Sequence, residues 1–244
     1  MKKLLYLLIA ALLLPLALEA KIPDMKFRRL DIREGLSNSS VNCIFRDSRG
    51  YVWIGTAYGL NRYDGYRVKT FFSNFRDSTT MRENSTSEIM EDWEGKLWLH
   101  QGMNYSVYDP VTERFERNAA RALEPYIGQF GGVDRLFIDR NKNFWVKTND
   151  EGIIYYNPKT KKKTVFKSGY GADEINPTYG ISTVTDDYDN NNVVFATFNG
   201  ELISLNGEKG VKVWEQKWIR ENGGPENREY RLSIDQQHNL WVST

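Results

Sequence analysis

Few residues of this 244-residue chain have the type and spacing of catalytic groups. The single cysteine, Cys43, excludes an intrachain disulfide, and the two histidines, His100 and His238, leave little from which to build a zinc site. No Gly-x-Ser-x-Gly element is present. Asp and Glu total 32, so a glycosidase that uses a pair of carboxylates remains an alternative. We predict no catalytic residue and interpret the chain as a non-enzyme.

Two turns resemble calcium-binding loops but lack the groups that complete such a loop. Residues 139–143 (DRNKN) and 187–191 (DYDNN) carry acidic or amide side chains at alternate positions. Neither has glycine at the sixth position, and Asp150 and Phe198 stand where a bidentate Glu is expected. We therefore predict no metal and no cofactor.

One sequence pattern recurs along most of the chain. It starts with Asp, followed by Gly three residues later, Trp six later and Tyr-Asp sixteen and seventeen later, as in residues 47–64 and 92–109. The third copy has one extra residue, the fourth is degraded with Val194 in the Trp place, and the fifth begins at Asp235. The Trp-equivalent positions are 53, 98, 145, 194 and 241, spaced by 45, 47, 49 and 47 residues.

Each unit of the repeat predicts four short strands. In the first unit they are 41–45, 51–56, 60–63 and 67–72, separated by turns that contain Gly or Asp. A period of this length with four strands per unit indicates a β-propeller in which each unit is one blade. We predict an all-β fold, a partial ring of about four and a half blades over residues 21–244, with few helices.

The Trp residues are expected to pack between blades, because a single blade cannot bury both faces of its sheet. This accounts for much of the 14% aromatic content. Segment 27–32 alternates in polarity and is expected to supply the outer strand of a closing blade. The recurring Asp residues (47, 92, 139, 187 and 235) are interpreted as turn caps. The predicted structural core residues are Trp53, Trp98, Trp145 and Trp241.

The first twenty residues have the parts of a secretory signal peptide. Lys2 and Lys3 precede an apolar run from Leu4 to Leu18, which is shorter than the roughly 20 residues that span a bilayer. Cleavage after Ala20 is predicted, with an uncleaved anchor as the alternative. Lys and Arg total 33 against the 32 acidic residues, and this balance argues against nucleic-acid binding by broad electrostatic attraction.

Candidate ligand residues are found where a unit departs from its own repeat. The Gly55-Thr56 step becomes His100-Gln101 in the second unit and Lys147-Thr148 in the third. These steps precede the loops between second and third strands, which should lie with the blade-joining loops around the central channel. Aromatic and amide groups there suit sugar recognition, although ordinary solvated loops are the alternative. The predicted set is His100, Gln101, Lys147, Tyr58, Tyr105, Asn149 and Phe198, with Asn104, Asp150 and Asn199 nearby.

The first unit closely resembles the two-component regulator propeller repeat. The matching pieces are Gly35-Leu36-Ser37, the VWIGT run at 52–56, Gly59-Leu60 and Tyr63-Asp64-Gly65, and the resemblance weakens through the later units. It implies the start of a periplasmic sensor from a hybrid two-component system of gut Bacteroidetes. Such receptors have two seven-bladed propellers, an immunoglobulin-like domain, one inner-membrane span and a histidine kinase, often followed by receiver and DNA-binding domains.

The resemblance also implies a function. The ligand would be an oligosaccharide from glycan breakdown, and the output would be regulation of polysaccharide-utilisation genes. The implied partners are the remaining blades, the downstream sensor domains and a second receptor copy in a homodimer, with no nucleic acid bound by this segment. An exported carbohydrate-active lyase or glycosidase remains an alternative, favoured by three or more carboxylates or His outside the repeat on one channel face. A protein-binding scaffold is the other, favoured by an exposed apolar patch there.

Overall fold

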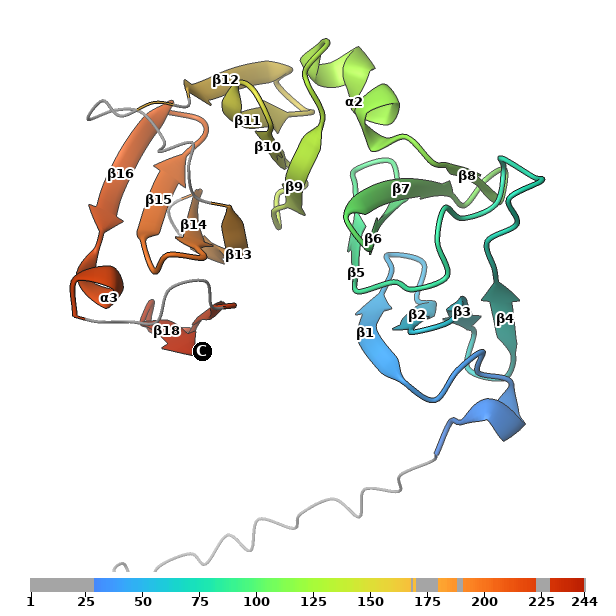
Figure 1. The fold of residues 1–244 in the computed structure, drawn as a ribbon. Coiled ribbons are helices and arrows are strands. Elements are labelled where there is room, and N and C mark those ends of the chain that lie inside the picture. The colour runs from blue at the N-terminus through green and yellow to red at the C-terminus, as the bar shows by residue number, and fades with distance from the viewer. Residues whose placement is uncertain (1–28, 168, 170–179, 188–190, 223–228, 244) are drawn as a thin grey trace, which may run out of the picture.

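The computed structural model describes residues 29–167, 169, 180–187, 191–222 and 229–243. Its sheets follow one another along the chain and form an open arc (Figure 1). Within the described residues, four sheets have four antiparallel strands each and a fifth has two. The strands of each sheet are hydrogen-bonded in sequence order. The predicted all-β propeller architecture is therefore confirmed.

The blades have similar strand lengths. Blade 1 contains β1 (Val41–Arg46), β2 (Val52–Thr56), β3 (Leu60–Tyr63) and β4 (Val68–Phe71). Blade 2 contains β5 (Glu88–Glu91), β6 (Leu97–Gln101), β7 (Asn104–Asp109) and β8 (Arg114–Glu116). Blade 3 contains β9 (Val133–Ile138), β10 (Phe144–Thr148), β11 (Gly152–Asn157) and β12 (Lys162–Lys167). Blade 4 contains β13 (Ile181–Asp187), β14 (Asn192–Thr197), β15 (Leu202–Asn206) and β16 (Val211–Gln216), and the partial blade 5 contains β17 (Arg231–Ile234) and β18 (Leu240–Ser243).

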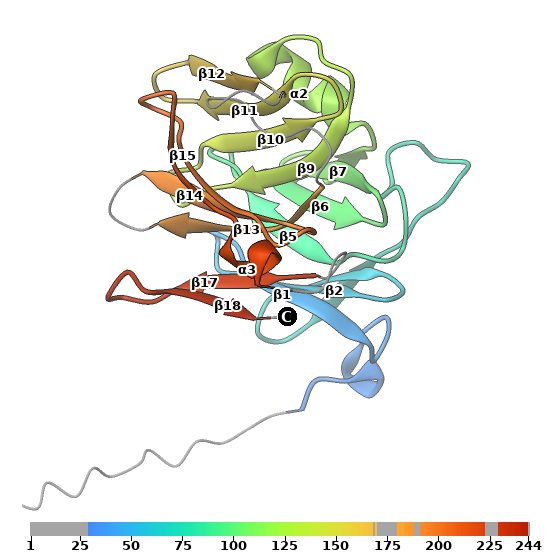
Figure 2. The same ribbon diagram turned by 60° about the vertical axis from the view of Figure 1, so that its left-hand side comes forward.

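The first strand of each blade lies on the inner side of the arc. β1 contacts β5, β5 contacts β9, and β13 contacts β17, so successive inner strands are neighbours. In Figure 1 the strands of blades 1 and 4 run outward in sequence order, and Figure 2 shows the same sheets from another side. Side chains of the inner strands therefore surround the channel, and the loops before them share one face with the loops between second and third strands.

Three short helical segments accompany the strands within the described residues. The segment η1 (Ile32–Glu34) is a 3₁₀ helix capped by the Asp31 carboxylate, so the predicted closing strand is wrong for its described part, residues 29–32. Helix α2 (Ala119–Ile127) lies between blades 2 and 3, begins at the N-cap Asn118 and buries Leu123 and Ile127. Helix α3 (Trp218–Glu221) follows blade 4.

The hydrophobic core is divided among the blade junctions. Trp53 lies 5.1 Å from the ring of Tyr108 in blade 2, measured between ring centroids, in an edge-on contact. Trp98 contacts Phe144 in blade 3 at the same distance, and Trp145 contacts Phe195 in blade 4 at 6.0 Å. All three indoles are buried, and each packs onto the blade that follows its own.

Trp241 does not belong to this core, which corrects its predicted role. Its side chain is 62% exposed. The following blade covers Trp53, Trp98 and Trp145, whereas Trp241 lies in the two-stranded sheet at the end of the described chain. Its exposure therefore has a geometric cause, since no further blade packs on this sheet in the described residues.

The Asp that begins each unit performs two tasks. Asp47 Oδ1 accepts hydrogen bonds from the backbone N–H groups of Arg49 and Tyr51, which closes the turn. Its Oδ2 accepts from Trp53 Nε1 at 2.8 Å, so the same carboxylate also orients the indole. This arrangement recurs in the pairs Asp92–Trp98, Asp139–Trp145 and Asp235–Trp241, each at 2.9 Å. These four repeated Asp residues are therefore architectural.

Candidate ligand site at the channel mouth

Gln101 points into the protein and away from any ligand. It takes the position that Thr56 and Thr148 hold in blades 1 and 3, and like them it is buried. Its Nε2 donates to the carbonyl of Glu83 at 2.8 Å, and its Oε1 accepts from Ser106 Oγ at 2.6 Å. Both ends of the amide are thus engaged inside blade 2. We therefore remove Gln101 from the candidate site, as a correction.

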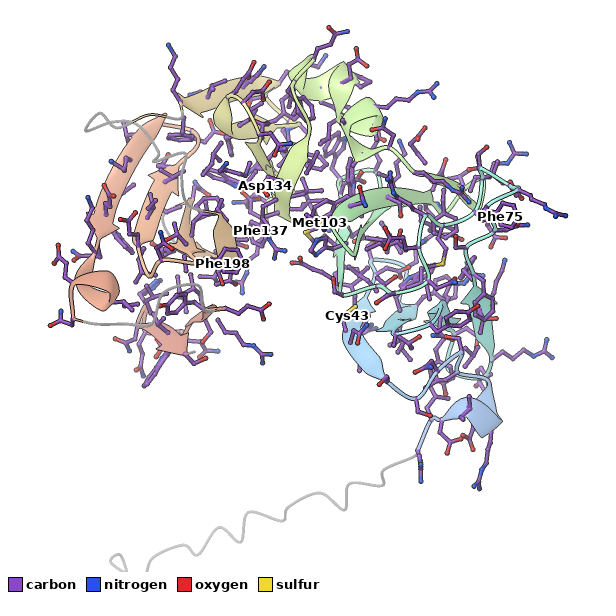
Figure 3. All side chains as sticks on the ribbon, viewed as in Figure 1. Cys43, Phe75, Met103, Asp134, Phe137 and Phe198 are labelled. Carbon is purple, nitrogen blue, oxygen red and sulfur yellow. The ribbon has the colours of Figure 1, made fainter. Side chains whose placement is uncertain are left out.

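Lys147 is also buried, and its ammonium group already has partners. Its Nζ lies 3.6 Å from Asp134 Oδ2 and donates to the carbonyl of Thr148 at 3.2 Å. Asp134 lies on the inner side of the arc (Figure 3). Lys147 therefore contributes to the charge balance of the channel, with its own hydrogen bonds made within blade 3.

Two other predicted residues lie away from this region. Tyr58, 56% exposed, lies in the loop after β2 of blade 1, with its ring centroid 5.8 Å from that of Phe72. Phe198 follows β14 in blade 4, where its N–H donates to the carbonyl of Gly180 at 3.1 Å. Figure 3 shows Phe198 on the inner side of the arc, on a different blade from His100. The predicted residues are therefore spread over four blades.

His100 and Tyr105 form a stacked pair at the centre of the site. Their ring centroids are 4.5 Å apart, with 16° between the planes. His100 Nδ1 lies 3.2 Å from Ser87 Oγ. Burial, assisted by the nearby Arg135 cation, lowers the pKa of His100 to about 4, so the imidazole is neutral near pH 7. A neutral imidazole can both donate and accept a hydrogen bond.

Tyr105 is buried and connects two blades. The backbone N–H of Leu136 on β9 donates to its hydroxyl at 3.2 Å. Burial raises the pKa of Tyr105 to about 12, so the phenol remains protonated at physiological pH. This hydrogen bond therefore fixes the Tyr105 ring, on which His100 stacks, and holds blade 2 against blade 3.

Glu88 and Arg135 complete the inner surface and were missed by the sequence reasoning. Arg135 Nη2 lies 2.9 Å from Glu88 Oε2. Burial raises the pKa of Glu88, and the Arg135 cation partly offsets that rise. In the strand register, Glu88 is directly opposite His100 and Arg135 is directly opposite Lys147. Looking for the cross-strand partners of His100 and Lys147, the two residues that depart from the repeat, could therefore have identified Glu88 and Arg135.

These side chains line a cavity of about 400 Å³ that we call the channel mouth. It is bounded by inner strands and strand ends from blades 2 to 5, so several blades contribute polar groups to one space. The hydroxyls, carboxylates, guanidinium groups and imidazole are those that hydrogen-bond to sugars. The lining residues are Ser87, Glu88, His100, Arg135, Ser182, Thr183, Glu229, Tyr230 and Arg231.

A second hollow of about 400 Å³, the loop hollow, adjoins the channel mouth through Tyr105. Tyr105 lines the loop hollow and stacks on His100, which lines the mouth. Asn104 and Asn149 also line it, and Asn104 Nδ2 donates to Glu83 Oε1 at 3.3 Å. Arg117, at its edge, donates to backbone carbonyls of the loop at 74–80 and so holds that loop in place. Two of the predicted residues, Tyr105 and Asn149, thus share this hollow.

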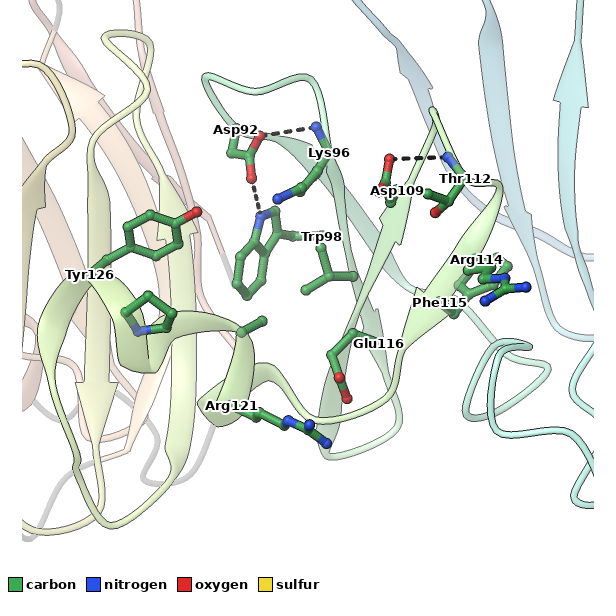
Figure 4. Close-up of a pocket in the computed structure, with 13 residues that line it drawn as sticks. Asp92, Lys96, Trp98, Asp109, Thr112, Arg114, Phe115, Glu116, Arg121 and Tyr126 are labelled. Carbon is green, nitrogen blue, oxygen red and sulfur yellow. Dashed lines mark hydrogen bonds between the residues drawn. The ribbon is translucent and has the colours of Figure 1, made fainter.

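A third hollow, of about 380 Å³, lies on the other side of blade 2 against α2 (Figure 4). We call it the side groove. Trp98 and Tyr126 lie along it, and Asp92 accepts hydrogen bonds from Trp98 Nε1 and the backbone of Lys96. Asp109 accepts from the backbone N–H of Thr112 at 3.4 Å. These carboxylates are engaged in turns and in holding the indole.

Other candidate reactive groups are poorly placed for chemistry. Burial raises the pKa of the half-buried Cys43 thiol to about 11, which makes it a weak nucleophile. Asp139 Oδ2 accepts hydrogen bonds from Trp145 and Asn143, so the calcium-like loop at 139–143 uses its carboxylate internally. The other calcium-like loop includes residues 188–190, which lie outside the described residues. Among the described residues, no group of three or more His, Cys, Asp or Glu is arranged to hold a metal ion.

The described part of the chain contains no helix of the length and apolarity needed to cross a membrane. The predicted signal peptide, residues 1–20, lies outside the described residues.

Comparison with known proteins identifies the repeat. Residues 35–58 match the family model of the two component regulator propeller. Blade 1 carries this repeat. Over 68 residues the chain is 38% identical to histidine kinase P4 of Formosa agariphila. The aligned stretch covers 28% of this chain and 5% of that protein. The resemblance seen in the first unit is thereby confirmed.

Solved structures with a similar fold include two extracellular domains from B. thetaiotaomicron. One is described as that of a hybrid two component system, with a TM-score of 0.60 and 23% identity over 88% of this chain and 29% of that chain. The other is described as that of a one component system, with a TM-score of 0.60 and 20% identity over 88% of this chain and 30% of that chain. At these identities the likeness establishes the propeller fold. The chain spans under a third of either structure.

Proposed function

We propose that this chain is part of the ligand-sensing region of an exported two-component receptor, and that its channel mouth binds an oligosaccharide. The repeat in blade 1 and the 38% identity to a histidine kinase support a place in such a receptor. The observation that supports the ligand is the convergence of polar side chains from four blades on one cavity of about 400 Å³. A cavity of this volume suits a ligand of a few sugar rings.

The chemistry of the mouth suits sugar hydroxyls, each of which both donates and accepts hydrogen bonds. Ser87, Ser182 and Thr183 offer hydroxyls of the same dual character, and Arg135 and Arg231 offer donors. The neutral imidazole of His100 adds a group that can take either role. This mixture favours a polyhydroxylated ligand over an apolar one.

The proposed signal follows from where the lining residues come from. A ligand held by several blades resists changes in the angles between them, which couples binding to the shape of the arc. In a periplasmic receptor anchored in the inner membrane, ligand capture would alter the geometry of a homodimer. The remaining blades and downstream domains would carry that change to the kinase and on to polysaccharide-utilisation genes.

The test is calorimetric titration of the full-length protein with a panel of plant and host oligosaccharides, combined with chromatography of the mixtures. The variant His100→Phe keeps a ring on Tyr105 and removes both ring nitrogens. We expect specific binding without turnover, weakened about tenfold by His100→Phe, because a lost hydrogen bond of about 1.4 kcal/mol changes Kd by that factor. Tyr58→Phe, in blade 1, is the control and should bind normally. Absence of binding across the panel would overturn the proposal.

A carbohydrate-active enzyme is the second candidate, because Glu88, His100 and Glu229 all line the mouth. Their number meets the criterion of three acidic or histidine groups outside the repeat. Glu88 is ion-paired with Arg135, however, and the imidazole has a pKa of about 4, which suits a binding surface better than an acid–base pair. Product formation that Glu229→Gln abolishes would favour the enzyme instead.

A further inference from the structure

The charged side chains around the channel mouth occur in acid–base couples. Glu88 pairs with Arg135 at 2.9 Å. Beside them on blade 3, Asp134 pairs with Lys147 at 3.6 Å.

Across the mouth, Glu229 and Arg231 flank Tyr230 and line the same cavity. His100, which also lines it, is neutral near pH 7. The formal charges of the lining side chains therefore cancel.

Arg135 carries a donor that the protein leaves unused. Its Nη2 is engaged with Glu88, while its Nε is buried and has no hydrogen-bond partner within the described residues. A buried N–H without an acceptor is costly, and an oxygen atom supplied by a ligand would remove that cost. Arg135 lines the channel mouth, so a shift of its side chain would bring this Nε–H to a ligand acceptor there.

The ion pair decides which kind of acceptor fits. A carboxylate or sulfate would compete with Glu88 for the Arg135 guanidinium and would leave the Glu88 carboxylate without its partner. Glu88 is 29% exposed in its side chain, and separating a partly buried ion pair leaves an uncompensated charge. A hydroxyl or carbonyl oxygen can accept from Nε and leave the ion pair intact.

We propose that the channel mouth selects an uncharged oligosaccharide, with Arg135 Nε donating to a hydroxyl or carbonyl oxygen of the ligand. This inference rests on the proposed function and specifies the ligand class of the same site. Arg135 becomes a specificity-determining residue, because its Nη2 is already engaged with Glu88.

The experiment compares each neutral oligosaccharide with its own acidic counterpart. The full-length protein is titrated with neutral glucan, mannan, galactan and arabinan oligosaccharides, each beside a derivative with one carboxylate. A fully methyl-esterified oligogalacturonide and its free acid provide a further pair with one backbone. The neutral member should bind at least about tenfold more tightly, and its Kd should change less than about twofold between roughly 0.05 M and 0.5 M salt.

Two variants test the residues. Arg135→Lys keeps the positive charge opposite Glu88 but removes the Nε donor, and should weaken neutral-ligand binding about tenfold. Arg114→Lys, in the side groove, makes the same change elsewhere and should have no effect. Glu88→Gln releases the guanidinium, so the acidic derivative should gain about tenfold relative to the neutral ligand. This gain keeps the inference testable should Arg135→Lys fold poorly.

The outcomes separate this inference from the proposal beneath it. Tighter binding of the acidic derivatives with a steep salt dependence would overturn the selection of an uncharged ligand and leave oligosaccharide sensing in place. Unchanged discrimination in a folded Glu88→Gln protein would also overturn it. Failure of the folded wild-type protein to bind any member of either series would instead overturn the proposed function.

Discussion

Replacing Asp92 with alanine tests how much the repeated Asp–Trp pair stabilises the blades. Asp92 is buried and accepts from Trp98 Nε1 at 2.9 Å, and from the backbone N–H groups of Glu94 and Lys96 at 2.9 and 3.0 Å. The substitution leaves the buried indole N–H without its acceptor, which alone costs about 1–3 kcal/mol. Burial also raises the pKa of Asp92, so part of the hydrogen-bond gain offsets desolvation of the carboxylate. We expect Asp92→Ala to lower the free energy of unfolding by about 2 kcal/mol.

The matched control is Asp235→Ala in the partial blade. Asp235 makes the same bonds, to Trp241 Nε1 and to the backbone N–H groups of Gln237 and Asn239, each at 2.9 Å. Because Trp241 is exposed, water replaces the lost acceptor, and the urea midpoint should hardly move. The assay is urea unfolding with hydrogen exchange of the β6 amides, which reports on blade 2 locally. Equal losses in both variants would refute the reasoning, since burial would then have no part in the effect.

Three further substitutions test other parts of the molecule. Gln101→Ala removes the partner of the buried Ser106 hydroxyl, so we expect a lower thermal midpoint and a loss of about 2 kcal/mol in the free energy of unfolding. Ligand affinity should not change, and weaker ligand binding would return Gln101 to the site. Burial, reinforced by the charge of Asp139, raises the pKa of Asp186 from 3.8 to about 6. Its protonated form therefore favours the folded state, and the stabilisation present below pH 3.8 is lost as pH rises through about 6. Asp186→Asn should make the urea midpoint depend less on pH between 3.8 and about 6, and an unaltered pH dependence would contradict this. In Gly207→Ala, the new Cβ would lie 2.2 Å from the ring of Tyr155 in blade 3, so we expect a loss of about 1–3 kcal/mol in urea unfolding, and normal stability would show that the ring can move aside.

The strands of blade 1 could be predicted because their signals are local. The alternation of apolar residues and the Gly-containing turns gave residues 60–63 for β3 and 41–45 for β1, which ends one residue later. Helix α2 could not be predicted in this way. It is nine residues long and contains Pro125, and it buries Leu123 and Ile127 in the cluster between blades 2 and 3. Its formation depends on tertiary packing, which outweighs local propensity.

The candidate site was located in part, and the strand geometry explains the remainder. Successive side chains of a strand point to opposite faces, so of His100 and Gln101 one reaches the channel mouth and the other enters the blade. The departure from the repeat identified the His100-Gln101 step, but it did not show which of the two side chains faces the channel mouth. Glu88 and Arg135 lie on the first strands of blades 2 and 3, opposite His100 and Lys147, and only the strand register reveals these pairings.

The fourth unit links this repeat to the proposed signal. Each Trp packs onto the following blade, so Val194 in the Trp place of blade 4 affects the junction with blade 5. At that junction Ala196, Leu202 and Tyr230 are buried. The partly buried residues packed against them are Trp214, Ile219, Leu232 and Leu240. Ser182 Oγ also accepts from the backbone N–H of Tyr230 at 2.7 Å across this junction.

The channel mouth has Ser182 and Thr183 on one side of the junction between blades 4 and 5, and Tyr230 and Arg231 on the other. A ligand that contacts both sides therefore adds its binding energy across this junction. Ligand binding would thus restrict the angle between blades 4 and 5, and a sensor needs such a restriction if occupancy is to change its shape.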